Sequence, residues 1–273
     1  MVVLTPTTDS NPPAPAELPA NHGPKTNGNG HYMPKALQDS LRDIVNNLIT
    51  EDDTPVDNLF SEKQQRLLTE SLFSSWQGPG NDRPFVAMAN VGMYYHTRSA
   101  PLVPDVLLSI DVQVPDELWE KSHRCYMIWE YGKSPDIVIE IVSNKVGEED
   151  DEMGKLRKYA LANVPFYVIF DPLNTLKQGQ LRVYERSSRT GYTLTSRRYF
   201  DDVGLALRLW DGPYEGVNAT WLRWYDRDQN PIPTGAERAN IETKRANTEA
   251  TARYLAEQRI AELEAKLAAL SNP

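Results

Sequence analysis

The sequence is poor in cysteine, in long hydrophobic runs and in positive charge. Cys125 is the only cysteine among 273 residues. The chain can therefore form neither an intramolecular disulfide nor a multi-thiolate metal site, which is typical of a reducing compartment. No apolar run approaches the roughly 18 residues that cross a membrane, and the N-terminus lacks the basic start and apolar segment of a secretory signal. We therefore expect a cytoplasmic protein with no membrane partner.

The deficit of positive charge bears on whether the protein coats nucleic acids or other polyanions. The net charge is −9, which argues against a general polyanion-coating role, because such binding depends on phosphate neutralisation by Lys and Arg. Five consecutive acids, Glu148–Glu152, supply over half of that charge. Consecutive helical residues point to different faces, so we expect these acids to be solvated rather than to bind a metal. A local basic groove could coexist with them, so nucleic-acid chemistry stays open.

Composition divides the chain into three parts. Residues 1–33 are rich in Pro, Asn, Gly and Thr, too polar to bury a core, and we expect a disordered tail there. Residues 36–233 alternate helical and strand patterns and form the expected folded domain. Residues 234–273 are dominated by Ala, Glu, Arg, Lys and Gln, and predict a long C-terminal helix.

The C-terminal helix carries a short coiled-coil pattern. Its apolar residues fit an a/d seam over about two heptads, which Glu242, Glu249 and Arg253 interrupt upstream. The seam predicts a weak coiled coil, and with it a homodimer through this helix or through the sheet domain. The residues of the seam are Ala256, Ile260, Leu263, Leu267 and Leu270.

The central part predicts a mixed sheet flanked by helices. Apolar spacing predicts helices over 36–50 and 61–76, the second capped by Ser61. A third helix over 147–163 separates two apolar strands, an order that implies parallel pairing of those strands. The Trp-rich segment beyond Gly204 is expected to be a β appendage whose tryptophans, Trp210, Trp221 and Trp224, lie in the core or face a partner, with base stacking as the alternative. The predicted strands cover 85–95, 103–112, 137–142, 166–170, 181–184 and 192–198.

One carboxylate lies within an otherwise apolar strand. Glu140 interrupts the run Ile-Val-Ile-Glu-Ile-Val, which is typical of a strand buried on both faces. A buried ionised side chain is costly unless it is paired or binds a metal. Asp105 opens a similar strand, and two acids at the ends of neighbouring strands could chelate a hard divalent cation.

A lysine completes the candidate catalytic set. Lys155 follows Glu140 by fifteen residues on the helix that crosses the sheet. Two acids that hold Mg²⁺ and one lysine that stabilises phosphate charge are the minimum for metal-dependent phosphodiester hydrolysis. Spacing alone leaves two alternatives open, a structural ion pair at Glu140 and another base in the role of Lys155. The competing bases are Lys145, Arg157 and Lys158.

Three segments resemble a known family. PDVLLSIDV, PDIVIEIVS and, after the acidic linker, KLRKYALANVPFYVIFDP are similar in order and spacing to the Uma2 family of restriction-endonuclease-like proteins. That family belongs to the PD-(D/E)XK nuclease superfamily. The resemblance implies an α/β fold with a mixed sheet flanked by helices, and a DNA endonuclease that uses Mg²⁺ or Mn²⁺.

The resemblance also implies residue roles. Asp105 and Glu140 match the metal ligands, and Lys155 matches a catalytic lysine displaced from the strand to the helix. The superfamily's usual lysine position holds Val142, and Asn163 replaces the family's usual Gly. A polar residue of the 61–76 helix is also expected at the site, with Glu62, Gln64 and Glu70 as candidates. The alternative function is an inactive nuclease fold that serves as an interaction module assembled through the C-terminal helix.

Overall fold

The structure is a computed structural model that describes residues 34–48, 58–80, 82–143, 154–187 and 191–271, with side chains up to Leu267. The predicted tail over 1–33 and the acid run 148–152 lie outside the described residues. Two helices open the described chain, α1 (Lys35–Asn46) and α2 (Leu59–Ser75). The side chain of Asn58 caps α2 by accepting a bond from the Ser61 amide at 3.0 Å. Ser61, the expected cap, instead lies in the first turn.

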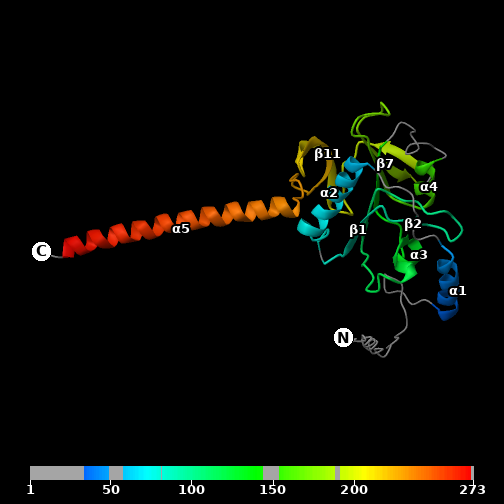
Figure 1. Ribbon diagram of the computed structural model, residues 1–273, viewed down its shortest axis with the longest axis horizontal. Helices are drawn as coiled ribbons and strands as arrows, with labels where there is room; N and C mark the ends of the chain where they lie inside the picture. Colours follow the sequence, from blue (N-terminus) through cyan, green and yellow to red (C-terminus); the bar gives the residue numbers. More distant parts are fainter. Residues whose placement is uncertain (1–33, 49–57, 81, 144–153, 188–190, 272–273) are drawn as a thin grey trace, which may run out of the picture.

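A six-stranded sheet forms the centre of the domain (Figure 1). Its strand order is β1-β3-β5-β6-β7-β8. Strands β5 and β6 pair in parallel, and every other neighbouring pair is antiparallel. The predicted mixed sheet is therefore confirmed. The strands are β1 (Phe85–Ala89), β3 (Val106–Ile110), β5 (Ile137–Ile141), β6 (Phe166–Phe170), β7 (Leu181–Ser187) and β8 (Gly191–Thr195).

The strand predicted over 85–95 is broken into two pieces. Asn90 adopts a left-handed backbone with φ 53°, which Asn tolerates better than most residues, and β1 ends at Ala89. After this break, β2 (Met93–Tyr94) leaves the large sheet and pairs in parallel with β4 (Tyr126–Met127). Two short helical turns, η1 (Lys121–His123) and α3 (Ile128–Tyr131), flank β4.

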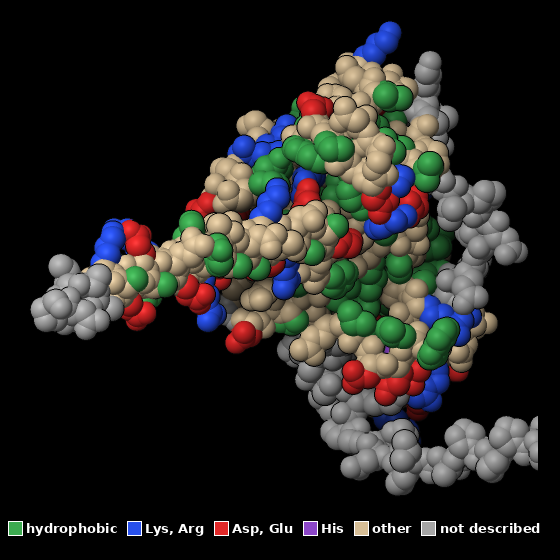
Figure 2. All heavy atoms as spheres, turned by 60° about the vertical axis from the view of Figure 1, so that its left-hand side comes forward, with side chains coloured by type: hydrophobic (Ala, Val, Ile, Leu, Met, Phe, Trp, Pro, Cys, Tyr) green, Lys and Arg blue, Asp and Glu red, His purple; other side chains and the backbone are tan. Residues whose placement is uncertain are grey.

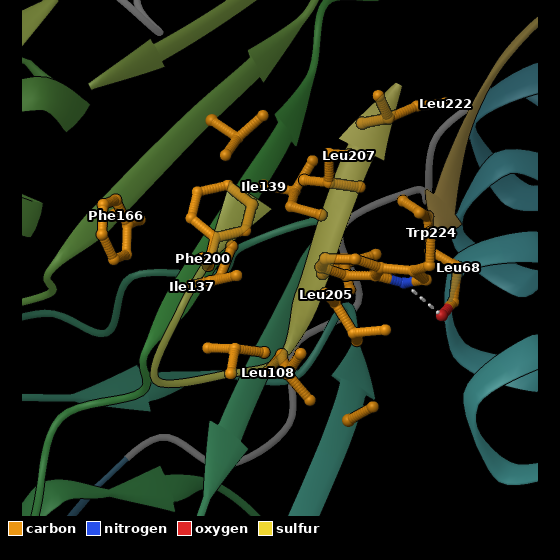
Figure 3. Packing of buried hydrophobic residues seen from close by; sticks show 14 of the residues in the cluster. Leu68, Leu108, Ile137, Ile139, Phe166, Phe200, Leu205, Leu207, Leu222 and Trp224 are labelled. Carbon is orange, nitrogen blue, oxygen red and sulfur yellow. Dashed lines mark hydrogen bonds between the residues drawn. The ribbon is translucent and has the colours of Figure 1, made fainter. Parts of the chain in front are cut away.

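The Trp-rich segment forms a second, three-stranded sheet of β9 (Tyr199–Phe200), β10 (Leu205–Tyr214) and β11 (Val217–Tyr225). Its inner residues pack with one face of the large sheet and with α2. Figure 3 shows Trp224 in this core, where its indole nitrogen donates to the Leu68 carbonyl at 2.9 Å. Trp221 and Trp224 are buried as expected. Trp210 is only partly buried and lies under the Arg223 guanidinium, 4.7 Å away.

The other face of the large sheet is covered by α4 (Lys155–Leu161). Alternation along β5 decides which residues face α4. Ile137, Ile139 and Ile141 belong to the core shared with the small sheet. Val138 and Val142 belong to the core shared with Tyr159 of α4. Glu140, between those two valines, therefore faces α4.

The C-terminal helix α5 (Gly235–Ser271) extends away from the domain (Figure 1). This confirms the predicted long helix, and its pairing in a coiled coil stays a prediction. The side chain of Leu270, the last residue of the predicted seam, lies outside the described part. None of the described helices combines the length and apolar composition needed to span a membrane.

Candidate active site

Asp105 and Glu140 lie opposite each other on adjacent strands. Val106 of β3 pairs with Ile139 of β5 in an antiparallel register. Extending that register by one residue places Asp105 opposite Glu140. Side chains of directly opposed residues share a face of the sheet, with Cβ atoms about 4.5–5.5 Å apart. The sheet therefore brings the two predicted carboxylates together.

Glu140 is almost completely buried, with 1% of its surface exposed. Its Oε1 accepts a bond from the Tyr159 hydroxyl at 2.6 Å, and its Oε2 accepts one from the Lys155 ammonium at 2.7 Å. These two donors offset the cost of burying a carboxylate, which is high for an unpaired charge. The ion pair that the sequence left open as a structural alternative for Glu140 is thus present, with Lys155 as its partner.

The first turns of α4 hold both partners of Glu140. Lys155 and Tyr159 are four residues apart and so share one face of the helix. Tyr159 is fully buried, whereas about a third of the Lys155 side chain, 32%, is exposed. Arg157 and Lys158, two of the competing bases, are exposed on α4, and Lys145 lies outside the described residues. The ion pair is therefore closed on its inner side and accessible from the outer side.

The pKa of the Tyr159 hydroxyl depends on its burial and on the charged groups near it. Its burial, followed by the negative charge of Glu140, raises the pKa of Tyr159 well above its usual value of 10.0. The charge of Asp105 also contributes to this rise in pKa. Tyr159 therefore stays protonated and donates to Glu140. Both carboxylates lie close enough to the Tyr159 hydroxyl to raise its pKa.

Asp105 is held from two sides. Its Oδ2 accepts a bond from the Ile141 amide at 2.5 Å, and its Oδ1 accepts one from the Gln65 amide nitrogen at 2.8 Å. The Asn90 side chain in turn donates to the Gln65 carbonyl oxygen at 2.9 Å. Asn90 also lies opposite Asp105 in the extended β1–β3 register. Asp105 thus has a defined orientation before any ligand binds.

Gln65 is the polar residue of α2 at the site, and it was not among the predicted candidates. Gln64, one residue earlier, points to the small sheet and exchanges two bonds with the Leu222 backbone, at 2.8 and 2.9 Å. Glu62 pairs with Arg66, and Glu70 accepts a bond from the Gly235 amide. A signal for Gln65 exists in its spacing, since it precedes the core residues Leu68 and Leu72 by three and seven positions.

A protein-family model matches residues 44–206, more than half of the chain. The family is Uma2, described as "Putative restriction endonuclease". The chain belongs to the Uma2 family. No curated protein matches the chain. The matched region includes every residue of the site described above, and it confirms the restriction-endonuclease-like resemblance that the three sequence segments indicated.

The Uma2 site of this chain departs from the superfamily pattern at Val142. Val142 shares a face with Glu140 but lies in an apolar cluster with 6% exposure. The ammonium group beside Glu140 comes from Lys155 of α4 instead. Asn163, just after α4, adopts a left-handed φ of 58°, so Asn serves the turn for which the family usually has Gly.

The donor chemistry of the site suits a hard cation. Within the described ranges, no group of three or more His, Cys, Asp or Glu side chains is placed to hold a metal ion. Asp105 and Glu140 would therefore supply two carboxylates at most. Mg²⁺ is commonly bound by one or two carboxylates and completes its shell with water and substrate phosphate oxygens. The residues present fit Mg²⁺ or Mn²⁺ better than a structural zinc ion, which needs four protein ligands.

Proposed function

We propose that this Uma2 protein is a DNA endonuclease that hydrolyses phosphodiester bonds with the help of Mg²⁺ or Mn²⁺. The observation that carries the proposal is the meeting of Asp105 and Glu140 across two strands, with the Lys155 ammonium 2.7 Å from Glu140. Membership of a family described as "Putative restriction endonuclease" supports the reaction class and DNA as the substrate.

Asp105 and Glu140 would hold the ion. When bound, such an ion activates a water molecule and screens the phosphate charge. Lys155 would stabilise the negative charge that develops on the phosphate, because its exposed ammonium end is the cation that a backbone phosphate could approach. Tyr159 and Gln65 act as positioning residues, since each directs one oxygen of a carboxylate by hydrogen bonding.

Plasmid nicking tests the proposal. The full chain with Mg²⁺ or Mn²⁺ should convert supercoiled DNA to open circles, and chelation of the ion should stop the reaction. Glu140→Ala should be inactive, whereas Asp228→Ala, which removes an exposed carboxylate in the turn after β11, should retain activity. Equal cleavage by the wild type and Glu140→Ala would reveal a contaminating nuclease and overturn the assignment.

A second function, an inactive nuclease fold that serves as an interaction module, is favoured by one observation. Each of the four carboxylate oxygens of Asp105 and Glu140 already accepts a hydrogen bond from the protein. Calorimetric titration with Mn²⁺ separates the two functions. A nuclease should give a binding heat that Asp105→Ala abolishes, and an interaction module should give none in either protein.

A further inference from the structure

The helix α5 exposes a large apolar and charged surface. Every described residue from Arg238 to Leu267 is exposed. At 1.5 Å per residue, its 37 residues span roughly 55 Å. Figure 2 shows hydrophobic, basic and acidic side chains along this helix. The large apolar residues of its outer half include Ile260, Leu263 and Leu267, which are 56%, 46% and 63% exposed.

The base of α5 is firmly attached to the domain. Thr234 and Glu237 form reciprocal bonds at its first turn, at 3.2 and 2.9 Å, the pattern of a capping box. The buried Arg223 of β11 binds Glu237 through two bonds, at 2.9 and 2.6 Å. Glu70 of α2 accepts a further bond from the Gly235 amide at 2.8 Å. The domain therefore determines the direction in which α5 leaves it.

The apolar residues of the outer half of α5 follow a heptad order, and the residue types at positions a and d of such an order influence how many helices associate. With Leu263 at position d, Ile260 and Leu267 fall at a, and Ala256 falls at d. A β-branched residue at a combined with Leu at d favours two parallel strands over three or four. The residue types at Ile260 and Leu263 therefore point to a pair of helices.

The charges beside the seam identify the partner as a second copy in parallel. Positions g of this seam are basic, at Arg259 and Lys266, and positions e are acidic, at Glu257 and Glu264. In a parallel pair, g of one helix faces e of the next heptad in the other, so Arg259 faces Glu264 of the second copy, twice by symmetry. In an antiparallel pair, basic positions would face basic ones. In the single chain, Arg259 pairs with Glu262, at 2.7 Å, and would turn to its new partner.

The inner half of α5 lacks the pattern. Positions d there are Glu242 and Glu249, and in a parallel pair these carboxylates would face their own copies. Arg253, at position a, also interrupts the seam, so the contact is confined to the part of α5 beyond Arg253. Arg253 lies eighteen positions beyond Gly235, which is about 27 Å of helix. Each domain would thus be separated from the paired segment by this unpaired length of α5.

We propose that α5 pairs with α5 of a second copy as a parallel, two-stranded coiled coil that begins at Ala256 and includes Ile260, Leu263 and Leu267. The two paired helices join two domains. Resting on the nuclease function proposed above, the pair would present two sites to one DNA molecule. Because a seam of about two heptads buries little apolar surface, we expect association that depends on protein concentration.

The mass of the full chain in solution, measured without metal or DNA, tests the pairing. Sedimentation equilibrium should show the dimer mass increasing with concentration. Leu263→Asp should give a monomer at every concentration, whereas Leu255→Asp, the same change at an exposed residue off the seam, should still dimerise. A monomeric wild type, or equal effects of the two substitutions, would overturn the proposal.

Oxidative cross-linking tests the orientation. Cys125 is buried, so a new cysteine on α5 would be the accessible thiol among the described residues. Leu263→Cys should form a disulfide-linked dimer, because a parallel pair places the two d residues face to face. Leu255→Cys should not. Equal cross-linking at both positions would contradict the parallel register, and neither experiment depends on nuclease activity.

Discussion

The charged side chains at the end of the large sheet differ from those on α5 beyond Arg238 in exposure and in where their partners lie. Glu140 is buried and binds two donors, Tyr159 and Lys155. On α5, pairs such as Arg245–Glu249 join two side chains that are 71% and 67% exposed. The first set belongs to a network across three elements, whereas the second consists of neighbours within one helix.

The comparison shows what the two kinds of charge do. A buried carboxylate that loses a partner keeps its desolvation cost, so its partners are tightly constrained. An exposed pair is screened by water and contributes about 0–1 kcal/mol. The charged groups at the end of the sheet therefore keep one another in fixed positions. The exposed pairs on α5 beyond Arg238 can exchange partners when a second helix approaches.

Lys155→Met should have the largest effect, because it leaves Glu140 buried with one fewer donor. We expect a loss of about 2 kcal/mol in the free energy of unfolding, less than for a fully buried pair, since Lys155 is a third exposed. Nicking should fall at least about a hundredfold. Urea unfolding and plasmid cleavage measure the two effects. Lys158→Met, on the exposed side of α4, is the matched control for stability, and an equal loss there would contradict the comparison.

Tyr159→Phe should have the next largest effect. It removes a hydrogen bond to a charged group, which costs about 1.5 kcal/mol, and it should lower nicking about 10- to 100-fold, as for groups that orient a metal ligand. Tyr192→Phe removes a bond to the Val164 carbonyl instead and should leave activity unchanged. Equal activity of Tyr159→Phe and the wild type would show that the hydroxyl does not position Glu140.

The raised pKa of Tyr159 gives this prediction a pH dependence. A group whose pKa is higher in the folded state stabilises the fold below its unfolded pKa, near 10, and loses that contribution as the pH rises further. The stability difference between the wild type and Tyr159→Phe should therefore be constant from about pH 6 to 9 and shrink above about pH 10. A difference that changes around neutral pH would contradict the assignment.

Glu237→Gln should have a smaller effect, at the base of α5. Burial acts to raise the pKa of Glu237, but the bonds from Arg223 and Thr234 outweigh it and lower the pKa below 4.5. Since the pKa is lowered, the stabilisation is present above the unfolded value and is lost as the pH falls through the folded one. We expect a loss of about 1 kcal/mol at neutral pH that disappears in acid. Urea unfolding at several pH values measures it, with Glu242→Gln as the control.

Arg245→Ala should have the smallest effect. It breaks the exposed Arg245–Glu249 pair, 3.1 Å long, outside the proposed coiled-coil segment. We expect a change of less than about 0.5 kcal/mol in the free energy of unfolding. A loss as large as that of Lys155→Met would mean that exposed and buried charges in this protein do not differ as described above.

Much of the fold could be predicted because its signals are local. The β-branched runs of β5 and β6, with a helix between them, indicated parallel pairing, and the structure has it. Glu140 stood out because a carboxylate in such a run needs compensation. Asn90, where the chain leaves the sheet, was missed because apolar residues continue on both sides of it and conceal the left-handed turn.

Less of the site could be predicted, because it depends on which side chains meet in space. Lys155 was recognisable from its place on the crossover helix. Gln65 was missed because it and Gln64 are adjacent glutamines that differ only in the direction they face. Which of the two reaches Asp105 depends on the rotation of α2 over the sheet, a property of packing rather than of local pattern.

The sequence by itself determined most of the large sheet, the family and the two acids and one lysine able to do chemistry, since these follow from residue type and spacing. Only the tertiary structure decided the partners. The β3–β5 register placed Asp105 opposite Glu140, and the packing of α4 brought Lys155 and Tyr159 to the two oxygens of Glu140. The physical reason is that hydrogen bonds and ion pairs act over a few ångströms, and distances on that scale are set by how elements pack together.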